Sequence, residues 1–331
     1  MSNQRIRVAI CGYGNLGRGV EKAIARNTDM ELVGIITRRP AVISKQTSAR
    51  VVSEDEATAL ANDVDVLIMC GGSATDLPVQ VPKFAKYFNT VDSFDTHRKI
   101  PEYLKAVSES AKAGGKLAIC SNGWDPGLFS LIRSMIASIF PEAAVEKIIY
   151  TFWGEGVSQG HSDAIRRIDG VKDARQYTIP IQKAVDRVRK GENPKLTDGE
   201  KHTRLCYVVA EDGANLNEIE KEIVTMPNYF ADYKTTVKFI SEEELRAKHK
   251  GLPHGGLVIA TVETSPGIKQ RIEFKLLLDS NPEFTGSVLT SYARAAYRMN
   301  QQGMTGAITP LHVPQIMLDP REENEVIADL L

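Results

Sequence analysis

Residues 5–11 (RIRVAIC) and the glycine-rich hexapeptide after them set the predicted fold. The first stretch is short, rich in β-branched residues and bounded by glycine, which is typical of a buried strand. The spacing of apolar residues over 15–27 then predicts a helix. The hexapeptide between them fits the pattern G-x-G-x-x-G and consists of Gly12, Tyr13, Gly14, Asn15, Leu16 and Gly17. In this strand–turn–helix setting the pattern indicates a dinucleotide-binding loop rather than an ordinary glycine turn.

The glycines of this pattern have separate mechanical roles. They permit a tight turn, a close approach of pyrophosphate to the backbone, and close packing of the helix on the strand. The free N–H groups and the positive dipole end of the helix attract phosphate. We therefore predict that residues 12–17 bind the cofactor.

Further strands are predicted at 32–37, 64–70, 90–92 and 116–120, and a helix at 102–113. Parallel strands need crossover connections, so this alternation favours an α/β fold with a Rossmann-type, doubly wound parallel sheet. We assign residues 1–122 to this dinucleotide-binding domain and expect residues 285–331 to pack back onto it.

The pattern changes after residue 123 and predicts a second, mixed α+β domain over 123–284 that binds the substrate. A helix is expected over 128–140. Later apolar runs predict longer strands without regular helices between them, which favours an antiparallel sheet. These runs cover 201–210, 235–240, 257–263 and 271–278, and a last helix is expected over 287–302. The polar segment 187–201 is expected to be a solvated loop.

The end of the second predicted strand favours NADP(H) over NAD(H). An NAD site usually has an acid about 20 residues past the glycines. This chain has Thr37, Arg38 and Arg39 there instead. Two guanidinium groups and a hydroxyl can hold a 2′-phosphate through charge-assisted hydrogen bonds, whereas an acid would repel it. The alternative is a solvated arginine pair at a strand end.

Small residues follow the third predicted strand: Gly71, Gly72, Ser73, Ala74 and Thr75. Ligands of doubly wound sheets bind at the carboxyl ends of the strands, so we expect these residues to line the ribose and nicotinamide path. The alternative is a plain turn with a helix cap at Ser73 or Thr75.

Acidic clusters follow two later strands, at 92–97 (DSFDTH) and 121–127 (SNGWDPG). Paired carboxylates near a nicotinamide can bind an ammonium group or move protons. Trp124 would add an apolar wall that excludes water. The alternative for the second cluster is an Asp-Pro-Gly turn with a helix-capping aspartate.

The segments 152–163, 252–256 and 281–284 have the glycine-rich, polar character of loops that bind ligands. His161, Asp163 and His254 match no recognised ligand spacing, so we predict no metal site.

Composition excludes several classes of protein. Among 331 residues, 41 Lys+Arg balance 42 Asp+Glu, which argues against a nucleic-acid binder. The four cysteines show no Cys-x-x-Cys spacing, which argues against a zinc cage or redox pair. The chain has no apolar run of membrane-spanning length and begins directly with a strand, so we expect no membrane partner and a cytoplasmic location.

Together these segments resemble the NADP-dependent meso-diaminopimelate dehydrogenase family. The segments SQGHSDA (158–164) and NGWDPG (122–127) are specific to that family, and the resemblance runs to about residue 308. It implies a reversible oxidative deamination, in lysine biosynthesis, of the D-centre of meso-2,6-diaminopimelate to L-2-amino-6-oxopimelate and ammonia. It also implies a homodimer formed through the second domain.

The resemblance carries over a set of site residues. Asp95, which we favour over Asp92, and Asp125 would lie at the reacting amino group as the candidate catalytic residues. That end of the substrate would also contact Trp124, Trp153, Gln159, Gly160 and Asp163, and the non-reacting L-centre would contact Thr178, Arg204, His254 and Asn281. Arg39 would take the 2′-phosphate, and the cofactor would further contact Phe94, Asp95, Thr96, Trp124, Asp125, Pro126 and Gly127.

The substrate carries two ammonium and two carboxylate groups, so its site needs both acids and an arginine. Two other functions stay open at this point. One is a related Rossmann dehydrogenase for another D-amino acid, and the other is an NADP(H)-sensing regulator without catalysis. The sequence does not assign a general base.

Overall fold

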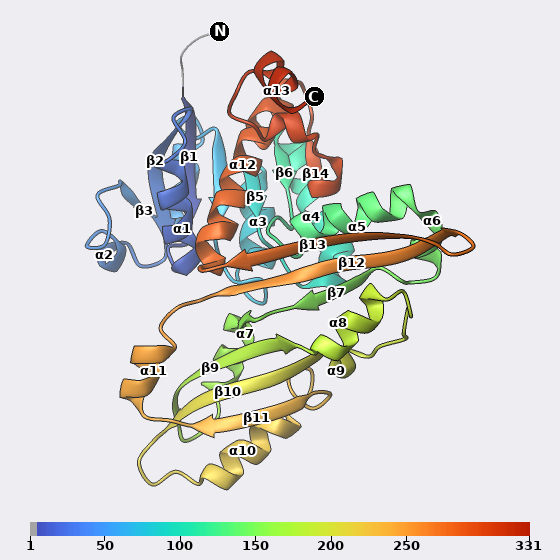
Figure 1. The fold of residues 1–331 in the computed structure, drawn as a ribbon. Helices are drawn as coiled ribbons and strands as arrows, with labels where there is room; N and C mark the ends of the chain where they lie inside the picture. Colours follow the sequence, from blue (N-terminus) through green and yellow to red (C-terminus); the bar gives the residue numbers. More distant parts are fainter. Residues whose placement is uncertain (1–4) are drawn as a thin grey trace. The chain divides into compact units, whose positions relative to one another are not determined.

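The computed structural model describes residues 5–331, and the chain divides into two compact units (Figure 1). Unit 1 comprises Met1–Leu131 and Pro282–Leu331, and unit 2 comprises Ile132–Asn281. The sequence pattern places these boundaries at 122/123 and 284/285. In the structure the segments that precede and follow unit 2 in the sequence therefore belong to one unit.

Unit 1 contains a seven-stranded sheet in the order β14-β6-β5-β4-β1-β2-β3. Every neighbouring pair of strands is parallel, which confirms the predicted doubly wound sheet. The strands are β1 (Ile6–Cys11), β2 (Met30–Thr37), β3 (Val51–Ser53), β4 (Val66–Met69), β5 (Asn89–Asp92), β6 (Leu117–Ile119) and β14 (Gly306–Ile308). The strand order reverses between β1 and β4, which is where such sheets bind ligands.

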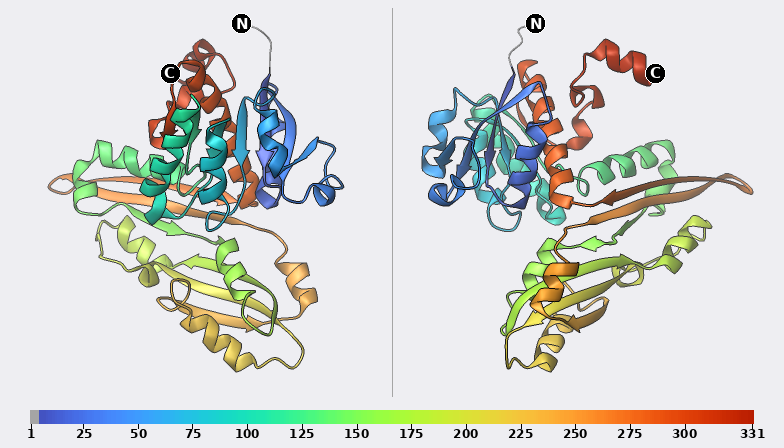
Figure 2. Two further views of the ribbon diagram at one scale, coloured as in Figure 1. Left: turned by 180° about the vertical axis from the view of Figure 1, so that it is seen from behind. Right: turned by 60° about the vertical axis from the view of Figure 1, so that its left-hand side comes forward.

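Both faces of this sheet are apolar because successive side chains of a buried strand point to opposite sides. Val8 and Ile10 belong to one hydrophobic cluster, with residues of α1 (Asn15–Ile24) and α12 (Asn281–Gln301). Ala9 and Cys11 belong to the other, with residues of α3 (Leu77–Ala85) and α4 (Ile100–Ala113). Helices α1 and α12 thus pack on one face of the sheet of unit 1, and α3 and α4 pack on the other (Figure 2).

The C-terminal segment completes unit 1. It adds β14 beside β6 and places α12 against the sheet. On α12 the side chain of Arg294 is 1% exposed, and it donates to both carboxylate oxygens of Asp29 (2.6 and 2.8 Å), to Asn27 (2.6 Å) and to the Leu318 carbonyl (2.7 Å). These contacts tie α12 to the loop before β2.

Short elements make up the rest of unit 1. They are α2 (Pro40–Ile43), α13 (Glu323–Leu330) and the 3₁₀ turns Glu54–Leu60, His97–Lys99, Pro310–His312 and Gln315–Met317. Helix α5 (Leu128–Ile139) begins in unit 1 and ends in unit 2. Within the described residues 5–331, none of the helices has the length and apolarity that crossing a membrane requires.

Unit 2 contains two sheets, in the orders β11-β10-β9-β8 and β13-β12-β7. Its strands are β7 (Tyr150–Trp153), β8 (Gly156–Val157), β9 (Val171–Pro180), β10 (His202–Ala210), β11 (Lys234–Phe239), β12 (His254–Ser265) and β13 (Ile268–Leu278). Its helices are α6 (Pro141–Val145), α7 (Gln159–Ile165), α8 (Gln182–Arg189), α9 (Asp198–Lys201), α10 (Leu216–Thr225) and α11 (Glu242–Lys248). The pairing is antiparallel except for β10 and β11, which are parallel.

The structure corrects three predictions for unit 2. Helices α10 and α11 separate strands that were expected to follow one another without helices, and α10 is the crossover that the parallel pair β10–β11 requires. The segment 187–201 includes the end of α8 and the whole of α9, so it is only partly a loop. The expected loops 152–163 and 281–284 contain the first turns of α7 and α12, and His254 of the expected loop 252–256 begins β12.

Candidate active site

A cavity of about 330 Å³ lies in unit 1 at the carboxyl ends of β1, β2 and β4. Backbone hydrogen bonds fix this edge of the sheet, since Gly12 N–H donates to Ile36 O (2.9 Å) and Cys70 N–H to Cys11 O (2.7 Å). The cavity is lined by Cys11, Gly12, Tyr13, Gly14, Ile36, Thr37, Arg38, Arg39, Glu54, Cys70, Gly71, Gly72, Asp76 and Gln80. The glycine loop and the two predicted arginines therefore share one cavity.

The start of α1 is suited to an anion. Its N-cap is Gly14, which has no side chain to occupy the first N–H groups, and its first residues are uncharged. A Cβ on Gly17 would lie 2.3 Å from the Gly12 carbonyl oxygen, so the tight turn requires glycine there. Leu16 packs on the core, and the Tyr13 hydroxyl bonds to Glu21. Gly12, Tyr13 and Gly14 thus line the cavity, while Leu16 and Gly17 support it.

The two arginines at the end of β2 differ in their contacts. Arg38 is 68% exposed and forms an ion pair with Asp76 (2.9 Å), whose other oxygen accepts from Gly72 N–H (3.1 Å). Arg39 is exposed, and its backbone N–H donates to the Thr37 hydroxyl (3.2 Å). Asp76 was not among the predicted site residues, although it follows the small residues 71–75 directly.

The loop after β4 contacts the loop after β5. Ser73 Oγ accepts a hydrogen bond from the backbone N–H of Asp95 (3.2 Å). The N-cap of α3 is Asp76, so the alternative of a helix cap at Ser73 or Thr75 is wrong. Ala74 and Thr75 are exposed and lie outside the residues that line the cavity.

The three carboxylates on the two acidic loops of unit 1 differ in their exposure to solvent. Asp95 is exposed and Asp125 half-buried, whereas Asp92 is completely buried and hydrogen-bonded within the protein. Asp95 can thus reach a ligand and Asp92 cannot. Trp124 is 9% exposed and packs edge-on against Phe129, with the ring centroids 5.2 Å apart.

The other predicted cofactor contacts on these loops are mostly buried. Phe94 stacks on Tyr103 with the ring centroids 4.1 Å apart, and Thr96 is half-buried. Pro126 and Gly127 are buried in the turn that follows Asp125. At Gly127 φ is +124°, and a Cβ there would lie 2.1 Å from the Gly123 carbonyl oxygen, so this turn requires glycine.

Unit 2 places a buried arginine among polar and aromatic side chains. Arg204, 6% exposed, hydrogen-bonds to the hydroxyl of Thr178, its partner across β9 and β10. The Arg204 guanidinium carbon lies 4.0 Å from the ring centroid of Tyr233. Among the described residues, Arg204 Nε is a buried donor without a hydrogen-bond partner. A buried donor of this kind is suited to an anionic ligand.

Two histidines near Arg204 are held neutral. The pKa of His161 is lowered to about 4, mainly by burial and also by the nearby Arg204 and His254. Burial also lowers the pKa of His254, with a smaller contribution from Arg204. His254 Nδ1 accepts from Gly255 N–H (2.8 Å). At neutral pH these imidazoles therefore hydrogen-bond as neutral groups, and Arg204 carries the positive charge.

Trp153 is positioned by a histidine that sequence reasoning missed. Its backbone N–H donates to His202 Nε2 (2.8 Å), and the two rings stack with centroids 5.2 Å apart. Burial lowers the pKa of His202 to about 4, and nearby Arg204 and Lys201 act in the same direction. The Lys201 ammonium lies 5.7 Å from the Trp153 ring centroid. The available signal was a histidine two residues before the predicted Arg204.

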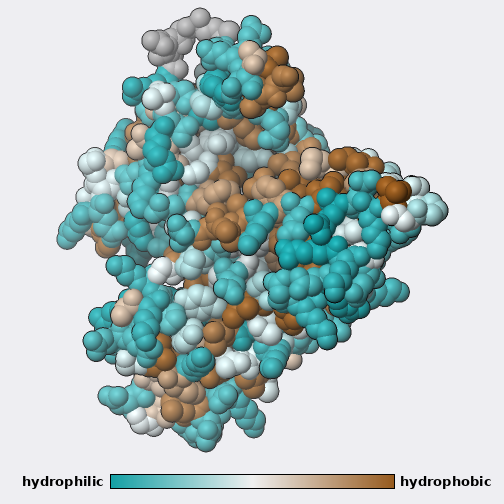
Figure 3. Space-filling view, in the orientation of Figure 1, coloured by the Kyte–Doolittle hydropathy of each residue, from teal (hydrophilic) through white to brown (hydrophobic). Residues whose placement is uncertain are grey.

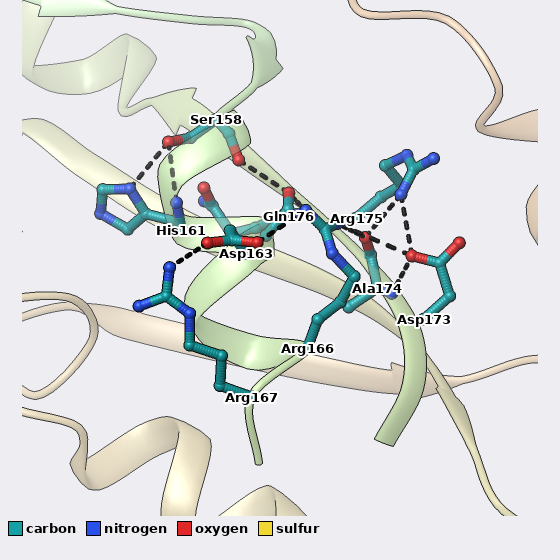
Figure 4. Close-up of polar contacts among 10 residues, drawn as sticks. Ser158, His161, Asp163, Arg166, Arg167, Asp173, Ala174, Arg175 and Gln176 are labelled. Atoms are coloured by element: carbon teal, nitrogen blue, oxygen red, sulfur yellow. Dashed lines mark hydrogen bonds and ion pairs between the residues drawn. The ribbon is translucent and has the colours of Figure 1, made fainter. Parts of the chain in front are cut away.

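Helix α7 carries Gln159, Gly160 and Asp163. Ser158 caps the helix and hydrogen-bonds to His161 Nδ1 (2.7 Å), and Asp163 forms ion pairs with Arg166 (3.4 Å) and with Arg167 (Figure 4). The charge of Asp163 is thus partly neutralised by two arginines that directly follow α7. The described residues contain no cluster of three His, Cys, Asp or Glu side chains with the arrangement of a metal site.

Asn281 is the last residue of unit 2 and the first of α12. Its backbone N–H donates to the Leu252 carbonyl (2.9 Å), which connects it to the segment just before His254. The structure therefore groups Thr178, Arg204 and His254 with Tyr233 and His161 in unit 2. Asp95, Trp124 and Asp125 belong to unit 1, which also contains the cavity, but none of the three lines it.

Comparisons with known proteins agree on one family. The model of the diaminopimelic acid dehydrogenase C-terminal domain matches residues 123–280. The chain is 56% identical to the meso-diaminopimelate D-dehydrogenase of Lysinibacillus sphaericus, over 98% of this chain and 99% of that protein. Among solved structures it is similar to diaminopimelate dehydrogenase of Corynebacterium glutamicum in complex with diaminopimelate (47% identity, TM-score 0.91, 99% and 100% of the two chains). It is also similar to an engineered D-amino acid dehydrogenase bound to NADP⁺ (46% identity, TM-score 0.87, 99% and 100% of the two chains).

Proposed function

The chain belongs to the meso-diaminopimelate dehydrogenase family, and we propose how the residues of its two units perform the reaction of that family. The enzyme is an NADP-dependent oxidoreductase that acts on a CH–NH₂ group. It converts the D-centre of meso-2,6-diaminopimelate to the ketone of L-2-amino-6-oxopimelate with release of ammonia, reversibly. The observation that carries this conclusion is an identity of 56% to a meso-diaminopimelate D-dehydrogenase over nearly the whole chain.

The residues of the unit 1 cavity fit NADP⁺. The Gly14 N-cap and the uncharged first turn of α1 suit the pyrophosphate, and Arg38 and Arg39 suit the 2′-phosphate. When bound, NADP⁺ accepts the hydride from the D-centre carbon. The loops that follow β4, β5 and β6 then hold the nicotinamide end, through Ser73, Phe94 and Pro126 among the predicted contacts.

Asp95 and Asp125 bind the amino group of the reacting centre. Both are carboxylates that are not fully buried, and an ammonium group is their natural partner. The D-centre carbon gives up its hydride when its amino group is neutral, so one proton first passes from the ammonium nitrogen to a carboxylate or to a water that the carboxylate holds. Water then adds to the imine carbon and ammonia leaves. Trp124 excludes bulk water from this end, which strengthens the contacts of the two acids.

Arg204, Thr178, His254 and Asn281 hold the non-reacting L-centre. Arg204 binds the carboxylate of the L-centre, because within residues 5–331 its buried Nε–H group lacks an acceptor and its guanidinium charge lacks an anionic partner. Trp153, Gln159, Gly160 and Asp163 shape the remaining contacts. A substrate without a second amino-acid centre leaves these buried polar groups unpaired, so it is bound weakly.

We also assign a homodimer and a cytoplasmic location to the enzyme. Exposed apolar side chains gather on α5 and at the end of α6, where Met135 is 46%, Ile139 55% and Val145 81% exposed. Figure 3 shows apolar residues over this region. Such a patch on a protein surface is typical of a subunit interface. Sedimentation equilibrium tests the dimer, and Val145→Lys is expected to weaken it.

The decisive experiment is NADPH formation at 340 nm with the meso, LL and DD isomers tested separately. Turnover of the meso isomer, and not of the LL isomer, supports the assignment. Faster reductive amination of pyruvate than of L-2-amino-6-oxopimelate would instead favour a dehydrogenase for another D-amino acid. Tight NADPH binding without turnover of any isomer would favour a regulator.

A further inference from the structure

Asp92, the last residue of β5, is the centre of a buried hydrogen-bond network in unit 1. Its side chain is completely buried. Oδ1 accepts from the backbone N–H groups of Phe94 (2.9 Å) and Ser121 (3.0 Å), and Oδ2 accepts from the Tyr103 hydroxyl (2.9 Å). The Asp92 carbonyl accepts from the backbone N–H (2.8 Å) and the side-chain amide (3.0 Å) of Asn122.

Apart from Tyr103, which lies on α4, these donors belong to two different loops. Phe94 precedes Asp95 on the loop after β5, and Ser121 and Asn122 precede Trp124 and Asp125 on the loop after β6. The ladder between β5 and β6 ends at the pair Val91 and Ile119. Beyond that pair, the hydrogen bonds of Asp92 take the place of the ladder and hold the two loops to each other.

The backbone at this junction between the two loops has a conformation that depends on the contacts of Asp92. Ser121 has φ +64°, a left-handed conformation that L side chains rarely adopt. Its N–H is the group that Asp92 Oδ1 accepts. Tyr103 both donates to Asp92 Oδ2 and stacks on Phe94, the residue before Asp95. Three donors therefore converge on one carboxylate and set the direction in which both loops leave the sheet.

Burying a carboxylate removes its hydration, which costs free energy. Stability alone therefore does not explain a carboxylate at this position. Burial raises the pKa of Asp92, while the hydrogen bonds from Ser121, Phe94 and Tyr103 act in the opposite direction. Burial and the neighbouring Asp92 raise the pKa of Tyr103, so the phenol stays a neutral donor. An asparagine at this position offers one acceptor oxygen in place of two.

We infer that Asp92 is a positioning residue that fixes the spacing of Asp95 and Asp125 at the reacting amino group. This inference rests on the proposed function, which places the D-centre at those two acids. Asp92 itself is too deeply buried to contact substrate, so it acts through the two loops. A displacement of a reacting group by about 1 Å can slow an enzyme about 100-fold, so the loss of this junction should be visible in turnover.

The test compares Asp92→Ala and Asp92→Asn with Asn89→Ala. Asn89 is a matched control because it lies at the other end of β5, is 4% exposed, and accepts from Leu117 N–H on β6 (2.9 Å). We expect kcat/KM for meso-diaminopimelate to fall at least about thirtyfold in Asp92→Ala. Asp92→Asn, which keeps one acceptor, should lose less, and Asn89→Ala should stay within about threefold of the parent. KM for NADP⁺ should change little in all three.

A second readout does not depend on turnover. The protein has two tryptophans, so in a Trp153→Phe background the fluorescence reports Trp124 alone. Asp92→Ala should change its emission maximum and its quenching by acrylamide, and Asn89→Ala should not. Equal effects of the Asp92 and Asn89 substitutions on kcat/KM and on fluorescence would overturn the inference.

The outcomes separate the two proposals. If the parent enzyme oxidises no isomer, the proposed function fails, and the fluorescence comparison still decides whether Asp92 holds the loops. If circular dichroism shows that Asp92→Ala does not fold, the comparison of Asp92→Asn with Asn89→Ala decides it. Wild-type kcat/KM and fluorescence in Asp92→Asn would then count against a positioning role.

Discussion

The guanidinium carbon of Arg204 lies 4.0 Å from the ring centroid of Tyr233. The aromatic ring supports the flat face of the cation, while Thr178 hydrogen-bonds to Nη1. A guanidinium group held in this way keeps its edge for a carboxylate, which it binds through two parallel N–H groups. Tyr233 is therefore one more residue of the candidate substrate site. It contacts Arg204 although the two residues are far apart in sequence.

Replacing Tyr233 with leucine should weaken binding of the L-centre. A cation–π contact at a desolvated site is worth about 1–2 kcal/mol, so KM for meso-diaminopimelate should rise about 5- to 30-fold. Tyr233→Phe keeps the ring and should change KM much less. Steady-state kinetics at saturating NADP⁺ measures both, and an equal rise in the two variants would show that the ring face is not what supports Arg204.

Replacing Arg38 and Arg39 with glutamine should change the preference between NADP⁺ and NAD⁺. Hydrogen bonds to charged groups contribute about 1.5–3 kcal/mol each, so KM for NADP⁺ should rise at least about 100-fold. KM for NAD⁺ should stay within a few-fold, because NAD⁺ has no 2′-phosphate. The control is Arg26→Gln, because Arg26 is exposed in the turn after α1 and its side chain hydrogen-bonds to Ser287 (2.9 Å). Equal rises for both cofactors would refute the phosphate assignment.

His202 should make unfolding easier as the pH falls from about 6.5 to about 4. Its pKa is about 4 in the folded protein, against an ordinary value of 6.5. In this window the unfolded chain binds a proton that the native protein does not, so the free energy of unfolding decreases as the pH is lowered. The contribution is fully present above pH 6.5, and a shift of this size corresponds to about 3 kcal/mol.

Urea unfolding between pH 4 and pH 7 measures this effect against His202→Gln. Glutamine does not titrate and offers an oxygen to the Trp153 N–H that now donates to His202 Nε2. The variant should therefore lose less stability on acidification than the parent, by about 3 kcal/mol at most. His161 titrates in both proteins and cancels from the difference. If the free energy of unfolding changes with pH in the same way in parent and variant, the prediction for His202 is wrong.

Arg294→Met should strongly destabilise unit 1. Breaking a buried ion pair by removing one partner costs about 3–5 kcal/mol, and here it also leaves Asn27 and the Leu318 carbonyl without their donor. Arg298→Met, one turn later on α12, removes hydrogen bonds to carbonyl groups only and should cost about 1 kcal/mol. Urea denaturation of both variants at pH 7 provides the comparison. Similar losses would mean that the Asp29 pair contributes little.

Local patterns predicted the sheet of unit 1 because each strand and the residues at its end lie close in sequence. The run before Gly12 and the glycines after it needed no distant contact to be recognised. Short strands were missed, as with β3 (Val51–Ser53), because three residues carry too little pattern. Strand β9 was missed because polar residues occupy its buried face, including Gln176 and Thr178, which hides the alternation.

The parts of unit 2 that sequence reasoning missed depend on contacts between distant segments. Helix α10 had a readable signal, since Asn215 caps it and Ile219 and Ile223 lie one turn apart and buried. The apolar runs on either side of it are typical of strands, and that pattern predicts consecutive strands without a helix between them. The pairing of Tyr233 with Arg204 and of His202 with Trp153 follows from strand register and stacking. Neither spacing nor composition encodes such pairs.

Because β14 and most of α12 come from the last 50 residues of the chain, the dinucleotide-binding unit cannot be completed during the first part of synthesis. Residues 132–281 must be translated first, which takes about 8–30 s at ordinary elongation rates. During that interval the nascent sheet lacks an edge strand, and the side chains that α12 will cover, such as Val8 and Ile10, have no partner from it. This apolar face of the nascent sheet therefore stays uncovered while the middle segment is being translated.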